Sequence, residues 1–356
     1  MNPKNYSSDS PISTKEEDRF SRWRFAERIA QVIAKRSDPS CLTIGLYGAW
    51  GDGKTSVLNF IEKSLKDNDG VVCIKFNPWR FTTEEELLSG FFIDIAEALD
   101  TELINSKDKL IDIVKKALPA VGSLAGAVVG IGGSAKGAGD FASSFISGVG
   151  LNQLKERVEQ ELESAKKRVL IIIDDIDRLE KSEIQALFKL VKLTADFKYT
   201  AYILAFDKEV VSASLQDRYS SSVRNAGEQF LEKIIQVPLH LPFVEKKVLR
   251  DFCFQGIDEA LSISEIQLSE QQIQEFVRDF TLAFDECLTT PRKAKLYGNI
   301  LMFSLPILKG EVNPVDLMLI EAIRVFCPPL YEAIRDNNDY FIGLSDGSRP
   351  SDNSQE

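Results

Sequence analysis

The chain has 356 residues, 44% of them hydrophobic and 27% charged, so it can bury a full α/β core and a second, smaller domain. Its formal net charge of −11 argues against a broad surface that tracks nucleic-acid phosphates. The single histidine, His240, lies in a strand-like apolar run, so neither a catalytic triad nor a zinc site is expected. The five cysteines form no C-x-x-C pair and indicate reduced core residues of a cytoplasmic protein.

The amino-terminal residues 1–15 are rich in Ser, Pro and Asn and are predicted to be disordered. Apolar residues then recur between charges over residues 15–35, which predicts an amphipathic helix at the start of a core domain at 16–242. This helix is expected either to pack near a bound base or to serve the core alone. Its expected apolar face is formed by Phe20, Trp23, Ile29, Val32 and Ile33.

The strongest pattern in the chain is a strand, a glycine-rich turn and a helix in succession. The β-forming run Leu42–Tyr47 leads into residues 48–55, which fit the pattern G-x-x-x-x-G-K-[ST]. A helical pattern follows from residue 55 to about residue 66. Glycines let the backbone curl so that successive N–H groups converge on nucleotide phosphates, and the helix N-terminus adds its positive dipole end. The chain is therefore predicted to bind a nucleoside triphosphate.

Within this phosphate loop, each residue type has an expected role. Lys54 is expected to reach the β- and γ-phosphates, and the Thr55 hydroxyl is expected to ligate Mg²⁺. The residues expected to line the phosphates are Gly48, Ala49, Trp50, Gly51, Asp52, Gly53, Lys54, Thr55 and Ser56.

A second strand is predicted at Val71–Phe76, and Pro78 ends it because proline cannot continue a central ladder. The residues that follow lie at the carboxyl end of a strand, where ligands bind in open α/β sheets. Trp79 and Arg80 are therefore expected either to rim the nucleotide site or to be a packed tryptophan and a solvated arginine. A helix is predicted next, at residues 84–99.

Residues 101–150 form a predicted insertion of unusual composition. Nine of the chain's 21 glycines fall between residues 118 and 150, and residues 117–135 carry no charge. The uncharged length approaches that of a membrane span, but Gly, Ala and Ser dominate over Leu and Ile. A flexible or helical-hairpin insertion is predicted, with membrane contact through 118–150 as the alternative. A helix at 151–166 is expected to close the insertion.

The second strong pattern is a buried strand that ends in carboxylates. The run Arg168–Ile173 is almost continuously β-branched, as in a strand buried on both faces, and Asp174 and Asp175 follow it. This is the pattern of a Walker B strand. Asp174 is expected to hold Mg²⁺ through its water shell, and Asp175 to orient and polarise the attacking water. Asp177 and Arg178 are expected to pair with each other or with a neighbouring subunit.

Two more strands complete the predicted sheet. One spans residues 199–206 and ends at Asp207, which is expected either to sense the γ-phosphate or to cap the helix that starts at Lys208. The other spans residues 235–242, and its two prolines fit an edge strand.

From residue 243 the pattern is helical, and residues 243–336 are predicted to form an α-helical C-terminal lid. Pro291 opens one of its helices. Arg292 beside it is expected either to reach a bound γ-phosphate or to be an exposed basic residue. The tail at 337–356 is polar. The expected helices lie near 270–286, 291–304 and 314–326, after a polar link at 261–268.

Several of these motifs occur together in one known family. Together they resemble the KAP family of P-loop NTPases over about residues 15–330. The motifs that carry the resemblance are the phosphate loop, Phe76-Asn77-Pro78-Trp79, Asp174-Asp175-Ile176-Asp177-Arg178, Ala205-Phe206-Asp207-Lys208 and Leu231-Glu232-Lys233-Ile234-Ile235-Gln236.

The resemblance implies an α/β P-loop NTPase fold of the additional-strand type, in which helices flank a parallel sheet and an α-helical lid follows. It also implies ATP hydrolysis with Mg²⁺. Members of the family often carry a membrane-spanning insertion between the Walker A and Walker B segments, where this chain has its glycine-rich, weakly hydrophobic residues 101–150. Bacterial relatives are associated with phage exclusion, so the resemblance implies a defence role.

The predicted function is Mg²⁺-dependent ATP binding and hydrolysis that drives a conformational or assembly switch, in anti-phage defence or in membrane-associated signalling. Lys54, Asp175 and Arg292 are the expected catalytic residues, and Thr55 and Asp174 the expected metal ligands. Phosphoryl transfer needs positioning and charge neutralisation rather than covalent help, so these groups suffice for a slow basal rate.

A homo-oligomer or a partner protein is expected, because an added arginine would raise this rate; Arg218 and Arg224 are the candidates in this chain. The alternative function is a nucleotide-gated scaffold with little hydrolysis. A small-substrate kinase would share the phosphate loop, but paired acidic residues suit water activation better. The expected location is the cytoplasm, with the inner face of the membrane as the alternative.

Overall fold

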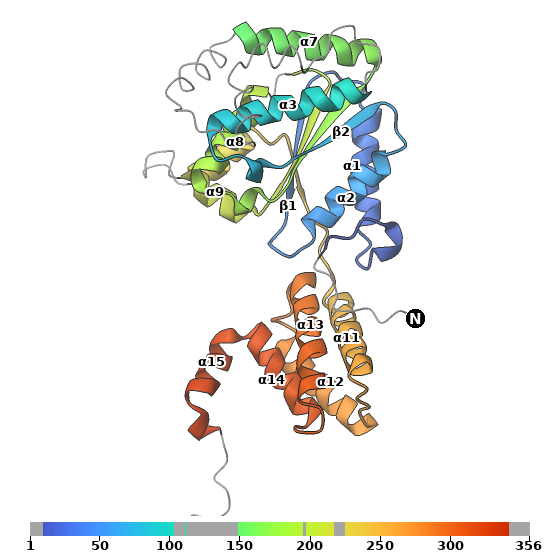
Figure 1. The fold of residues 1–356 in the computed structure, drawn as a ribbon, viewed down its shortest axis with the longest axis vertical. Coiled ribbons are helices and arrows are strands. Elements are labelled where there is room, and N and C mark those ends of the chain that lie inside the picture. Colours follow the sequence, from blue (N-terminus) through green and yellow to red (C-terminus); the bar gives the residue numbers. More distant parts are fainter. Residues whose placement is uncertain (1–9, 103–110, 112–148, 195–196, 217–224, 342–356) are drawn as a thin grey trace, which may run out of the picture. The chain divides into compact units, whose positions relative to one another are not determined.

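The computed structural model describes residues 10–102, 111, 149–194, 197–216 and 225–341 (Figure 1). The chain forms two compact units, one at Pro11–Pro242 and one that begins at Phe243. The first unit contains a β-sheet and the second is helical.

The sheet has five parallel strands in the order β2-β3-β4-β1-β5. Strand β4 therefore lies between β1, which leads into the phosphate loop, and β3, which leads into the carboxylates. This is the additional-strand arrangement, and it confirms the predicted fold class. Because all strands are parallel, their carboxyl ends meet at one edge of the sheet. The strands are β1 (Leu42–Tyr47), β2 (Val71–Phe76), β3 (Arg168–Ile173), β4 (Thr200–Phe206) and β5 (Val237–His240).

Helices cover both faces of this sheet and give it two hydrophobic cores (Figure 1). In β3, Val169, Ile171 and Ile173 pack toward α3, α7 and α8, whereas Leu170 and Ile172 pack toward α1 and α2. This two-sided burial explains why the strand is a continuous apolar run. The helices of this unit are α1 (Trp23–Lys35), α2 (Lys54–Leu65), α3 (Glu84–Glu102), α7 (Val149–Ala165), α8 (Lys181–Thr194), α9 (Lys208–Gln216) and α10 (Ala226–Glu232).

The amino-terminal helix begins later than predicted. A 3₁₀ turn at Lys15–Glu17 comes first, and α1 begins at Trp23 rather than at residue 15. Ser21 adopts a φ of 57°, in the left-handed region, which no continuous α-helix tolerates. The Oδ2 atom of Asp18 accepts a hydrogen bond from the Trp23 N–H at 2.7 Å, so a local carboxylate caps the helix.

Ile12, within the segment predicted to be disordered, makes specific contacts with α2. The Ile12 N–H donates to Ser56 Oγ at 3.3 Å, and Asn59 Nδ2 donates to the Ile12 carbonyl at 3.2 Å. These contacts differ from the prediction because α2 presents polar side chains to this backbone.

The predicted insertion lies largely outside the described residues, which include only 101–102, 111 and 149–150 of it. The membrane contact predicted for residues 118–150 therefore falls almost wholly in a part of the chain that is not described. None of the helices in the described ranges has the length and apolar character needed to span a bilayer.

Strand β5 pairs with β1 alone, so it is the edge strand that its prolines indicated. It spans only Val237–His240 and is shorter than the predicted 235–242. His240 is exposed on it and contacts the Tyr47 ring edge-on at 5.3 Å, so it is a strand residue but not a core residue.

The second unit packs its helices around an aromatic cluster. Phe280 contacts Phe284, Tyr297 and Phe326 with ring centroids 5.4–5.9 Å apart. Helix α11 extends through residues 261–263 of the predicted polar link, and α15 has no counterpart in the prediction. The helices are α11 (Lys246–Ile263), α12 (Glu270–Phe284), α13 (Pro291–Ile307), α14 (Pro314–Phe326) and α15 (Pro328–Asp336).

Two of the five cysteines, although distant in the sequence, lie close together in the structure. All five are free thiols, but only Cys41 and Cys253 are buried. The Sγ atoms of Cys287 and Cys327, 40 residues apart in the sequence, lie 3.7 Å from each other. The helical packing of the second unit brings this pair together.

Candidate functional site

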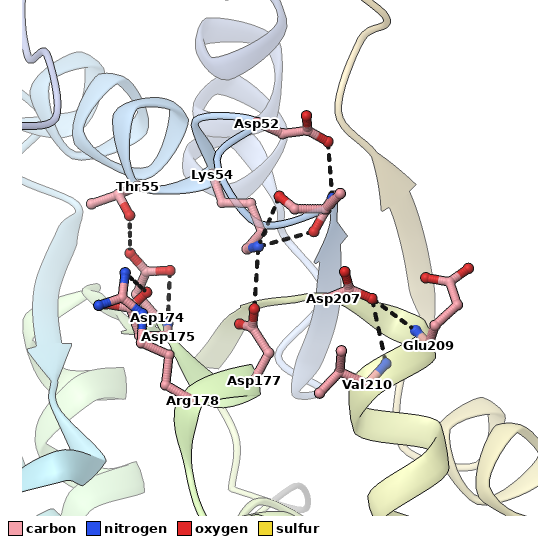
Figure 2. Close-up of polar contacts among 12 residues, drawn as sticks. Asp52, Lys54, Thr55, Asp174, Asp175, Asp177, Arg178, Asp207, Glu209 and Val210 are labelled. Atoms are coloured by element: carbon pink, nitrogen blue, oxygen red, sulfur yellow. Dashed lines mark hydrogen bonds and ion pairs between the residues drawn. The ribbon is translucent and has the colours of Figure 1, made fainter. Parts of the chain in front are cut away.

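The phosphate loop connects β1 to α2 at the carboxyl edge of the sheet (Figure 2). Gly51 and Gly53 have φ angles of 88° and 92°, a conformation that residues with a side chain rarely adopt. These two glycines let the loop turn back on itself immediately before the first residue of the helix.

One contact within the loop and one with the end of β4 hold the loop in shape. The Oδ2 atom of Asp52 accepts a hydrogen bond from the Ala49 N–H at 2.9 Å, and the Gly48 N–H donates to the Phe206 carbonyl at 3.3 Å. Burial raises the pKa of the Asp52 carboxyl, against the lowering effect of the Ala49 N–H and of Arg22. The loop is thus tied across its own turn and to the end of β4.

Arg22, which no sequence motif marks, stabilises the loop through a hydrogen bond to the loop backbone. Its side chain is buried, and its guanidinium donates to the Asp52 carbonyl and, at 3.2 Å, to the Pro242 carbonyl. Burial lowers the pKa of Arg22, although the Asp52 and Asp18 carboxylates oppose the shift. No local pattern marks this residue, because its two partners lie 30 and 220 residues away in the sequence.

Lys54 is the central cation of the site. It is only 6% exposed, and its Nζ donates to the Gly48 carbonyl at 2.9 Å and to the Ala49 carbonyl at 3.3 Å (Figure 2). The same Nζ lies 3.6 Å from Asp177 Oδ2. The ammonium is thus held inside the turn, where the motif places the β- and γ-phosphates.

Thr55 and Asp174, the two predicted metal ligands, lie next to each other. The Thr55 hydroxyl donates to Asp174 Oδ2 at 2.6 Å, and Asp174 Oδ1 accepts from the Asp175 N–H at 2.8 Å. Burial raises the pKa of Asp174, the Asp175 charge adds to this shift, and the Thr55 hydrogen bond opposes it.

A partly buried carboxylate beside a hydroxyl fits Mg²⁺ well, because the cation would offset the cost of desolvating the charge and both groups are oxygen ligands. Within the described ranges, no group of three or more His, Cys, Asp or Glu side chains could hold a metal by itself. Mg²⁺ typically keeps water and phosphate ligands in nucleotide sites, so two protein ligands suffice.

Asp175, the predicted water-orienting residue, faces Arg178. Its backbone is left-handed, with a φ of 56°, and its Oδ1 lies 2.9 Å from an Arg178 guanidinium nitrogen. Arg178 therefore pairs with Asp175, not with Asp177, which corrects the first of the two predicted pairings. Trp79 Nε1 lies 3.4 Å from the Asp175 carbonyl, so the 54%-exposed Trp79 stands beside the carboxylates.

The remaining predicted site residues lie outside the phosphate loop and outside the acidic residues that follow β3. Asp207 Oδ1 accepts hydrogen bonds from the Glu209 N–H at 3.1 Å and the Val210 N–H at 3.4 Å, which matches the capping alternative (Figure 2). Arg292 is the second residue of α13, in the helical unit, and its role as a sensor stays a prediction. The candidates Arg218 and Arg224 lie outside the described residues.

Comparisons with known proteins agree with this geometry. Residues 22–308 match the KAP family P-loop domain. The phage T7 exclusion protein of Escherichia coli strain K12 is 27% identical over 355 residues, which cover 91% of this chain and 47% of that protein. The chain thus spans about half the length of this curated relative.

Among solved structures, the fold is similar to the ORC1 protein of Aeropyrum pernix in complex with DNA, with 16% identity, 89% of this chain and 68% of that chain covered, and a TM-score of 0.41. It is also similar to Cdc6p from Pyrobaculum aerophilum, with 14% identity, 86% and 66% covered, and a TM-score of 0.43. The family match extends over most of the chain and confirms the resemblance drawn from the motifs. The chain belongs to the KAP family of P-loop NTPases.

Proposed function

We propose that this chain binds ATP with Mg²⁺ and hydrolyses it, and that hydrolysis drives a conformational or assembly switch. The observation that carries the proposal is the 2.6 Å hydrogen bond between Thr55 and Asp174, beside the buried Lys54. It joins the two halves of a nucleotide site, which lie 119 residues apart in the sequence.

Each group in the site has a part in this reaction. Lys54 and the backbone N–H groups of the loop bind the phosphates and neutralise charge that develops on them. Thr55 and Asp174 would hold Mg²⁺, which would supply charge neutralisation at the phosphate oxygens. A carboxylate after β3 orients the attacking water; the sequence favours Asp175 for this role.

The biological setting of the switch is part of the proposal. Similarity to a phage exclusion protein supports a role in anti-phage defence. A homo-oligomer or a partner protein would supply the additional arginine, and a cytoplasmic protein at or near the inner face of the membrane would suit such a role. A nucleotide-gated scaffold with little hydrolysis is the competing function.

Steady-state ATP hydrolysis across protein concentrations, with Mg²⁺ and with EDTA, tests the proposal. Turnover that needs Mg²⁺ and rises more than linearly with concentration is the expected result, because a shared site needs assembly. Tight ATP binding without turnover at any concentration would favour the scaffold instead. Absence of ATP binding would overturn both functions.

A further inference from the structure

The three carboxylates that follow β3 have different surroundings. Both oxygens of Asp174 already accept hydrogen bonds, from the Thr55 hydroxyl and the Asp175 N–H. The Asp175 side chain is 36% exposed and pairs with Arg178 at 2.9 Å. Neither of these two carboxylates has the surroundings expected of a group that holds a water molecule against the γ-phosphate.

Asp177 is the third carboxylate, and it is buried in the site. It lies in the 3₁₀ turn Ile176–Arg178, and its side chain is 6% exposed. Its Oδ2 lies 3.6 Å from Lys54 Nζ, and Figure 2 shows the carboxylate pointing at that ammonium. Its Oδ1 is buried and has no hydrogen-bond partner among the residues that the structure describes.

An ionised carboxylate can accept about four hydrogen bonds, and a buried oxygen without any donor is costly. In folded proteins such a group has one of three explanations: a catalytic role, local strain, or a bound water or ion. A water molecule between Asp177 and the phosphate loop would supply a donor to this oxygen.

The position of Lys54 shows that the Asp177 carboxylate lies close to the place where the γ-phosphate would bind. In a P-loop the lysine ammonium contacts the β- and γ-phosphates, so a carboxylate that reaches the same ammonium borders the γ-phosphate. Burial also keeps bulk solvent away, which strengthens the electrostatic effect of the carboxylate on a bound water.

We propose that Asp177, rather than Asp175, is the catalytic carboxylate that orients the attacking water; this assignment rests on the proposed ATP hydrolysis. Asp177 Oδ1 accepts a proton from that water while the water oxygen forms a bond to the γ-phosphorus. The bond from the γ-phosphorus to the bridging oxygen breaks, and its electron pair leaves with ADP. Asp177 then returns the proton to the released phosphate or to solvent.

The same geometry has a consequence for binding. Asp177 places a negative charge beside the ammonium that the phosphates must engage, so it competes with them for Lys54. Removing that charge therefore strengthens nucleotide binding while it slows hydrolysis. A residue with a structural role alone would weaken both.

Asp177→Asn and Asp175→Asn form a matched pair, since each keeps the shape of the side chain and removes one charge. We expect Asp177→Asn to lower the single-turnover rate about 100-fold or more, with an affinity for a fluorescent ATP analogue that is equal or higher. Asp175→Asn is expected to change the rate less than about fivefold. Asp177→Glu, which keeps a carboxylate on a longer side chain, is expected to recover part of the lost rate.

A rate for Asp177→Asn within about fivefold of the wild type, or an equal or larger loss in Asp175→Asn, would overturn the assignment and leave the proposed ATPase in place. Absence of turnover in the wild-type chain would overturn the proposed hydrolysis and the assignment with it. Weaker nucleotide binding in Asp177→Asn, with a lower Tm, would identify Asp177 as a structural residue and also overturn the assignment.

Discussion

The phosphate loop and the acidic segment at residues 174–178 face each other across the carboxyl edge of the sheet, but they are held in different ways. Loop groups are bonded to distant segments, through Arg22 and the Phe206 carbonyl, and to one another through the Asp52 carboxylate. The acidic segment makes its polar contacts mainly within itself and to the loop, and it leaves one buried oxygen of Asp177 without a partner. The loop is thus held in shape before a nucleotide binds, whereas the acidic segment retains one carboxylate oxygen, Asp177 Oδ1, that can still accept a hydrogen bond.

Of the changes that test the difference between the loop and the acidic segment, removal of Lys54 should have the largest effect on ATP binding. We expect Lys54→Ala to weaken ATP binding by about 100-fold or more, because the Lys54 ammonium is held by the carbonyls inside the turn of the loop, where it would meet the phosphates. Isothermal titration calorimetry measures the change. Lys63→Ala, an exposed lysine on the same helix, is the matched control. An unchanged affinity would remove Lys54 from the site.

The second prediction concerns the carboxylate that joins the two regions. Asp174→Asn should abolish Mg²⁺-dependent turnover and yet raise the Tm at pH 7 by about 2–4 °C, as roughly 1 kcal/mol does for a unit of about this size. The reason is that burial raises the pKa of Asp174 in the folded protein. The wild-type protein is therefore more stable when Asp174 is protonated, and it loses this part of its free energy of unfolding as the pH rises through the folded-state pKa.

The pH dependence supplies the control for this variant. The gain in Tm should shrink as the pH is lowered toward the ordinary carboxyl pKa of about 4, where the wild-type group is neutral too. Thermal unfolding at several pH values measures it. A Tm gain that does not depend on pH would contradict the electrostatic explanation.

A smaller effect is expected from removing the support of the loop. Arg22→Ala should weaken ATP binding about tenfold, because it leaves the Asp52 and Pro242 carbonyls without their charged donor. Titration with a fluorescent nucleotide measures it, and the exposed Arg19→Ala is the control. If both variants bind alike, the loop does not depend on this arginine.

The smallest effect concerns the rim of the acidic segment. Trp79→Phe removes a long hydrogen bond to the Asp175 carbonyl at an exposed position, so the turnover number should change by about twofold to threefold at most. Trp79 should contribute to the tryptophan fluorescence change on ATP addition, and the variant should keep only the part of that change that comes from Trp50 in the phosphate loop. A tenfold loss of turnover would instead place Trp79 in contact with substrate.

Most of the sheet could be predicted from the sequence. The runs at 42–47, 71–76 and 168–173 match the observed strands residue for residue. The first and third are buried along their whole length, which requires a nearly continuous apolar run, and the second is a mostly buried edge strand with Lys75 exposed. The glycine pattern likewise predicted the loop, since its positive φ angles need glycine. Local chemistry was sufficient in both cases.

Other features depend on contacts that no local pattern encodes. The start of α1 depends on the left-handed Ser21, and the role of Arg22 depends on partners far along the chain. Asp175 and Asp177 have the same side chain two residues apart, and only the turn after β3 decides which of them is buried beside Lys54. The burial and pairing of such groups are set by the fold as a whole.

The position of Arg22 has a mechanical consequence. One guanidinium holds both the Asp52 carbonyl in the phosphate loop and the carbonyl of Pro242, the last residue of the sheet unit. A shift of the loop by a fraction of an ångström must either stretch one of these bonds or carry the other along. The last carbonyl of the sheet unit is therefore coupled to the phosphate loop through one rigid, planar side chain, without any shared secondary structure.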